Sequence, residues 1–134
     1  MKLDGLKGKN NMAKWIWTSL GERKDQYVEF VSSFISPKTK LEMMICADTD
    51  YMVYVNNKLI NFDQFNFYPK HPVYDSFSFK CKEGLNTLKI IVHHNGGETF
   101  LTYAKGKAGL YFQIKDGENI VLESDEHVLS SESL

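Results

Sequence analysis

Apolar and polar side chains alternate with a period of two in several short segments of this chain, and this pattern most constrains its fold. The alternation is clearest at 41–48, 51–55, 87–94 and 109–115. Successive side chains of a β-strand point to opposite faces of the sheet, so the alternation predicts half-buried strands. No segment carries a persuasive helical stripe, and further strands are expected at 15–17, 27–35, 59–62, 75–80, 100–103 and 119–123.

The sequence around Gly117 predicts one hairpin. The three residues Lys-Asp-Gly that end at Gly117 suit a three-residue loop, with the glycine in the left-handed conformation that other residues adopt at a cost. This register places Phe112 opposite Ile120 and Leu110 opposite Leu122, so that apolar residues meet on one face.

A second hairpin is predicted at the Asn-Asn pair of 56–57. Asparagine tolerates positive φ better than most residues and therefore suits a two-residue turn. The resulting register places Val53 opposite Ile60 and Tyr51 opposite Phe62.

The length and the pattern of strands together predict one all-β domain. A chain of 134 residues, 43% of them hydrophobic, is long enough for one core and too short for two ordinary domains. The Cys and Trp spacing of immunoglobulin domains is absent, so we predict an antiparallel β-sandwich of jelly-roll, galactose-binding-domain-like type. Its expected limits are 13–128, between a flexible lead-in at 1–12 and a frayed tail at 129–134.

Composition argues against several partners. The net charge is −1 and no stretch of sequence concentrates Lys and Arg, so no nucleic-acid partner is expected. No apolar run approaches the roughly 20 residues that span a bilayer, so no membrane is expected either. Residues 1–11 lack the apolar core of a signal peptide, which predicts a cytoplasmic protein in which Cys46 and Cys81 are reduced, partly buried thiols.

The sequence lacks the motifs of self-contained catalysis, so we expect neither an enzyme nor a cofactor. His93 and His94 are neighbours in a strand and point to opposite faces, which prevents them from chelating one metal ion. His94 is instead expected to bond a loop at the end of its strand. Calcium at Asp48 and Asp50 is a weaker alternative to a plain turn.

The segment 61–74 is the strongest candidate for a binding site, because it combines aromatic rings, amides and carboxylates in one long connection. Loops carry function on a rigid scaffold, and aromatic faces stack on sugar rings or on a partner protein. The alternative is that these rings close the open edge of the sandwich. The predicted carbohydrate-binding residues are Asp63, Phe65, Asn66, Phe67, Tyr68 and Tyr74.

Six short motifs follow one another between about Ala13 and Asp125. Their order resembles that of the N-terminal β-sandwich domains of α-L-rhamnosidase-like glycoside hydrolases. The motifs are Ala-Lys-Trp-Ile-Trp at 13–17, Ala-Asp-Thr-Asp-Tyr-Met-Val-Tyr-Val-Asn-Asn-Lys at 47–58, Tyr-Asp at 74–75, Glu-Gly-Leu-Asn-Thr-Leu at 83–88, His-His-Asn-Gly at 93–96 and Ala-Gly-Leu at 108–110.

This resemblance implies a non-catalytic accessory domain. In the family, a separate helical barrel with acidic residues performs hydrolysis, and none of the motif residues here is a nucleophile or a base. The implied role is structural or carbohydrate-binding, with a carbohydrate or an adjoining catalytic domain as the partner. The alternative is a free-standing, lectin-like protein that binds carbohydrate without an enzyme.

Overall fold

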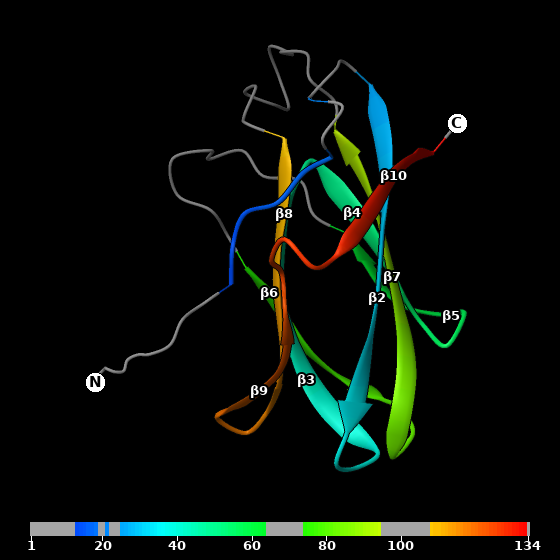
Figure 1. Cartoon of the computed structure of the whole chain (residues 1–134), viewed down its shortest axis with the longest axis vertical. Coiled ribbons are helices and arrows are strands. Elements are labelled where there is room, and N and C mark those ends of the chain that lie inside the picture. The colour runs from blue at the N-terminus through cyan, green and yellow to red at the C-terminus, as the bar shows by residue number, and fades with distance from the viewer. Residues whose placement is uncertain (1–12, 19–20, 22–24, 64–73, 95–107, 134) are drawn as a thin grey trace.

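The computed structural model describes residues 13–18, 21, 25–63, 74–94 and 108–133. These residues form two antiparallel sheets that pack face to face as a jelly-roll sandwich (Figure 1), which confirms the predicted fold class. The described part of the chain contains no helix that could cross a membrane. The expected lead-in at 1–12 and the expected strand at 100–103 lie outside the described residues.

Five strands form one sheet, in the order β10-β2-β7-β4-β5, and four form the other, in the order β6-β3-β8-β9. The chain crosses between the sheets repeatedly, which is the topology of a jelly roll. The strands are β2 (Gln26–Ser36), β3 (Lys40–Asp48), β4 (Asp50–Val55), β5 (Lys58–Asp63), β6 (Asp75–Lys80), β7 (Gly84–His94), β8 (Gly109–Asp116), β9 (Asn119–Glu123) and β10 (Leu129–Ser133).

The apolar residues that alternate in the sequence are those buried between the sheets. Each long strand contributes every second side chain to the core, and the intervening side chains lie on the outer faces. Burial of this apolar surface is the main stabilising term of the fold. The core includes Val28, Phe30, Phe34, Leu41, Met43, Ile45, Tyr51, Val53, Val55, Leu88, Ile90, Val92, Leu110, Phe112 and Ile114.

The hairpin at Gly117 forms, but the predicted register is wrong. Gly117 has a φ of 62°, as expected, and the loop holds two residues because Asp116 pairs with Asn119. The ladder then shifts between Ile114 and Lys115, so that Leu122 lies opposite Ile114 rather than Leu110. A bulge places two residues of one strand opposite one of the other, and turn chemistry alone does not predict it. Ile120 lies opposite Lys115 instead of Phe112.

The turn at 56–57 is confirmed, since both asparagines have positive φ values, 53° and 66°. The pairing next to the turn is as predicted, but a bulge shifts the register before Val53. Val53 therefore does not face Ile60, and Tyr51 does not face Phe62. The extra residue is on β5, the edge strand, where bulges are common.

Residues 129–133 correct the prediction of a frayed tail. They form β10, which pairs with β2 from Leu129 opposite Val31 to Ser133 opposite Tyr27. Pairing satisfies the backbone groups that the edge of β2 would otherwise leave open, even though the segment has no apolar alternation. The strand expected at 15–17 is reduced to a single bridge between Ile16 and Leu110.

Candidate functional site

The topology gathers the longer connections at one end of the sandwich, which we call the loop end and which lies at the top of Figure 1. β3, β5 and β7 end there, and β4, β6 and β8 begin there. Two predicted binding residues lie at this end: Asp63 is the last residue of β5, and Tyr74 directly precedes β6. The other four, Phe65, Asn66, Phe67 and Tyr68, lie outside the described residues.

Tyr74 is 44% exposed and packs edge-to-face on Tyr111 of β8, with 5.5 Å between ring centroids. Burial raises the pKa of the Tyr111 hydroxyl, and the neighbouring Tyr74 and Glu123 add to the effect. Cys46, opposite Tyr111 on β3, is fully buried, and burial raises its thiol pKa to about 11. Tyr74 thus has ring surface open to a ligand while it also packs against the outer face of the sheet.

A hydrogen-bond network joins the two strands from which the 61–74 connection departs. The Tyr51 hydroxyl donates to Oδ2 of Asp75 at 2.6 Å, and Nδ2 of Asn61 donates to the Tyr51 hydroxyl at 3.2 Å. Tyr51 is buried on β4, Asn61 is on β5 and Asp75 begins β6, so the network ties one sheet to the other. The roots of the predicted binding loop are therefore held in a defined geometry.

His93 lies between two carboxylates on the outer face of the five-stranded sheet. Its Nε2 is 2.8 Å from Oδ1 of Asp25, and its Nδ1 is 3.2 Å from Oδ1 of Asp50. The imidazole also stacks on Tyr27, with 4.5 Å between centroids and 23° between planes. Sequence reasoning missed this cluster, although the His-His pair was a visible signal, because Asp25 and Tyr27 approach only through the pairing of β2 with β7.

His94 points to the opposite face, as its position in the strand predicts. It is buried, its Nδ1 lies 3.2 Å from Oδ1 of Asp48, and its ring meets Trp17 edge-on at 5.9 Å. One described partner of His94 is therefore Asp48, the last residue of β3. Asp48 thus contacts His94, and Asp50 contacts His93. The described residues include no group of three His, Cys, Asp or Glu that could hold a metal ion.

The six motifs meet one another in the folded chain. Nε1 of Trp15 donates to the Ala108 carbonyl at 3.1 Å, and a Cβ on Gly109 would overlap the Trp15 ring, so this close approach requires glycine. At the other end of the sandwich, Nδ2 of Asn56 donates to Oδ1 of Asn86 at 2.9 Å. The motif residues thus act as contacts between strands and turns.

Comparison with known proteins agrees with these motifs. No protein-family profile and no curated protein matches the chain. The structure is similar to a GH78 family rhamnosidase of Bacillus sp. GL1, with a TM-score of 0.84 and 26% identity over 93% of this chain and 14% of that chain. An α-L-rhamnosidase from Aspergillus terreus gives a TM-score of 0.64 and 16% identity, over 82% of this chain and 15% of that one. A Pleurotus ostreatus lectin gives a TM-score of 0.58 and 21% identity, over 90% and 32%.

These similarities confirm the resemblance to rhamnosidase domains that the motifs indicate. The chain spans about one seventh of the length of these rhamnosidases.

Proposed function

We propose that this chain is a non-catalytic accessory domain of a rhamnosidase-like glycoside hydrolase. The observation that carries the proposal is the match to the Bacillus rhamnosidase, which extends over 93% of this chain but only 14% of the other. A match that covers nearly all of a short chain and a small part of a long one is expected for one module of a larger enzyme. The catalytic part belongs, on this proposal, to an adjoining domain.

The contacts of the described polar residues support a non-catalytic role. The carboxylate of Asp48 lies beside His94, and that of Asp50 lies beside His93. The carboxylate of Asp75 accepts a hydrogen bond from the Tyr51 hydroxyl. Glycoside hydrolysis usually needs two carboxyl groups that flank a sugar, and these three carboxylates are engaged with separate neighbours. They serve the scaffold of the loop end.

The loop end is the proposed contact for carbohydrate. Tyr74 offers ring surface of the kind that stacks on the C–H face of a sugar. The similarity to the Pleurotus lectin, which covers 90% of this chain, favours a second candidate function, a free-standing lectin-like protein. Carbohydrate binding without hydrolysis is common to both candidates.

A glycan array that includes rhamnose-containing polymers, combined with an assay for aryl rhamnoside hydrolysis, tests the proposal. We expect binding of a glycan and no release of rhamnose. Rhamnose release by this chain alone would contradict the non-catalytic role, and an array without any binding would contradict the carbohydrate contact.

The double variant F67A/Y68A tests the location of the site, with Leu85→Ala as the control, because Leu85 is an exposed apolar residue near the start of β7, at the end of the sandwich opposite the loop end. Weaker glycan binding at unchanged stability supports a site in the loop. Loss of stability instead indicates that these rings close the edge of the sandwich.

A further inference from the structure

Lysines that are dispersed along the sequence come together around the edge strand β6. They come from four strands and from the turns that precede β3 and follow β6, at the end of the sandwich opposite the loop end. We call this group the lysine surface. It consists of Lys38, Lys40, Lys58, Lys80, Lys82 and Lys115.

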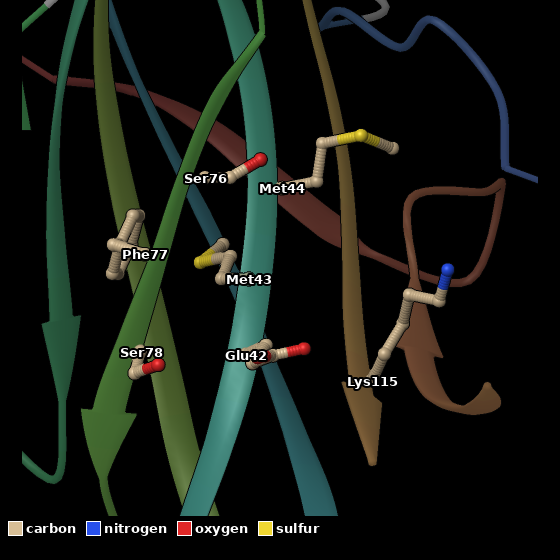
Figure 2. Close-up of a pocket in the computed structure, with 7 residues that line it drawn as sticks. All are labelled: Glu42, Met43, Met44, Ser76, Phe77, Ser78 and Lys115. Carbon is tan, nitrogen blue, oxygen red and sulfur yellow. The ribbon is translucent and has the colours of Figure 1, made fainter. Parts of the chain in front are cut away.

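Three adjoining depressions follow the lysine surface, and Ser78 lines all of them. A groove of about 520 Å³ runs between β5 and β6, with an apolar floor that includes Leu59 and Phe79, and no carboxylate is among its described lining residues. A depression of about 340 Å³ lies between the loop before β3 and the end of β8. A third, of about 320 Å³, lies on the outer face of β6, β3 and β8, where Figure 2 shows Ser78 and Lys115 on either side of Glu42.

The lysine surface includes a pair of like charges in a position that is unfavourable in a β-sheet. Lys40 and Lys80 are directly opposite each other on β3 and β6, and like charges in this position destabilise a strand pair. Among the described residues, Lys38 alone of the six makes an ion pair, at 2.6 Å from Asp116. The repulsion between Lys40 and Lys80 lowers stability and is not offset by an ion pair to either residue in the described part of the chain. Unfavourable local arrangements of this kind are typical of functional surfaces.

We propose that the lysine surface binds an acidic polysaccharide through the carboxylates of its uronic acid residues. The inference rests on the proposed carbohydrate-related function and adds the class of glycan. An open surface with spaced ammonium groups suits a chain that carries one carboxylate per sugar. The exposed hydroxyl of Ser78 lies among the lysines, and that of Ser76 lies farther along β6 on the same outer face, so both can bond sugar hydroxyls.

Two features favour a glycan over a nucleic acid. The cations are all lysine, whereas planar, bidentate recognition of phosphate favours arginine. The described residues that line the three depressions also include no exposed aromatic ring on which bases could stack, since Phe79 is buried and Phe77 is half-buried. An acidic peptide could add to the edge of β6 that no described strand pairs, and binding of poly-glutamate in the test would reveal this alternative.

The test measures the affinity of the 134-residue chain for polygalacturonate and for its methyl ester, which has the same sugar without the charge. We expect binding of the acid and not the ester, and weaker binding as NaCl rises from 50 to 500 mM. The double variant K40Q/K80Q should bind about tenfold more weakly while its melting temperature stays the same or rises, because the like-charge pair is removed. The control K14Q/K89Q removes two charges elsewhere and should bind within about twofold of the parent.

The proposal is overturned if the ester binds as well as the acid, or if K40Q/K80Q retains full affinity. Tighter binding of poly-glutamate or of a single-stranded oligonucleotide would also overturn it and assign the surface to another polymer. Should K40Q/K80Q fail to fold, the variant K58Q/K82Q removes two other charges, which line the groove between β5 and β6, and must show the same loss of affinity for polygalacturonate. Neutral glycans binding on the array without polygalacturonate binding would refute this inference alone, whereas rhamnose release would refute the proposed function alone.

Discussion

The two ends of the sandwich are built by different means. At the end opposite the loop end, which we call the hairpin end, short turns join the strands, as at 37–39, 56–57, 81–83 and 117–118. At the loop end, β5 and β6, and β7 and β8, are joined by more than ten residues each. Short turns depend on backbone geometry, whereas long connections need side-chain contacts to hold their roots, as Tyr51 does with Asp75.

The ends also differ in charge. Six lysines surround β6 at the hairpin end, together with the carboxylates of Glu42, Glu83, Asp116 and Glu118, whereas the described charged groups of the loop end include the carboxylates of Asp25, Asp48, Asp50 and Asp75. A net charge of −1 for the whole chain conceals this separation. Each end therefore offers a different chemistry to a ligand: rings and carboxylates at the loop end, and an excess of ammonium groups over carboxylates around β6 at the hairpin end.

The largest expected effect concerns the core that both ends share. Phe112 is fully buried on β8, so Phe112→Ala should lower the free energy of unfolding by about 3–5 kcal/mol. Tyr111→Ala, the adjacent residue on the outer face, should cost much less. Chemical denaturation of both variants measures the difference, and a larger loss for Tyr111 would invert the assignment of the two faces.

Local chemistry explains which parts of the fold the sequence predicts. The turn at 56–57 and the left-handed Gly117 follow from residues next to each other, and alternation identifies the core faces. Bulges depend on how the sheets pack, so both hairpin registers are wrong beyond the turn. β10 has Ser and Glu where alternation is expected, because an edge strand buries little.

The site follows the same division. Asp63 and Tyr74 lie at the two ends of the connection between β5 and β6, which follows from chain order alone. Tyr51 and Asp75 are 24 residues apart and meet because of the way in which the two sheets stack. The lysine surface is invisible to a search for runs of basic residues, because its members come from different strands and turns.

The second prediction concerns the rigidity of the hairpin end. The buried amide of Asn86 accepts from the Lys82 backbone N–H and from Asn56, and donates to the carbonyls of Lys82 and Gly84. Asn86→Ala leaves these groups without partners and should cost about 2–3 kcal/mol of unfolding free energy. Thr87→Ala, at the exposed neighbour, is the control and should be nearly neutral.

The third prediction makes the matching change at the loop end. Tyr51→Phe removes the hydroxyl that bonds Asp75 and Asn61 and should cost about 1–2 kcal/mol. Tyr54→Phe, on the outer face of the same strand, should cost less, because its hydroxyl has only a 3.8 Å contact with the Met52 sulfur. Urea denaturation ranks the variants, and a loss for Tyr51→Phe above that for Asn86→Ala would show that the loop end is the more strongly held.

The smallest expected effect on stability comes from the ion pair of Lys14 and Glu126, which lies outside the hydrogen-bond networks of Asn86 and Tyr51. Nζ of Lys14 lies 2.8 Å from Oε1 of Glu126, and this hydrogen bond lowers the pKa of Glu126 and raises that of Lys14. A carboxyl whose pKa is lower in the folded chain stabilises it above the unfolded pKa of about 4.3, and that contribution is lost as the pH falls through the folded value.

For Lys14, whose pKa is raised, the contribution is lost only in strong alkali, above the ordinary lysine pKa of about 10.4. Because both side chains are exposed, Lys14→Gln should change stability little at pH 7 and should flatten the pH dependence between about pH 3 and 5. Thermal denaturation across that range measures the effect, with Lys89→Gln as the control. If Lys14→Gln lowered the free energy of unfolding as much as Tyr51→Phe, this exposed ion pair would stabilise the fold as much as the Tyr51 network at the loop end. The expected order, in which a partly buried network contributes more than an exposed ion pair, would then be wrong.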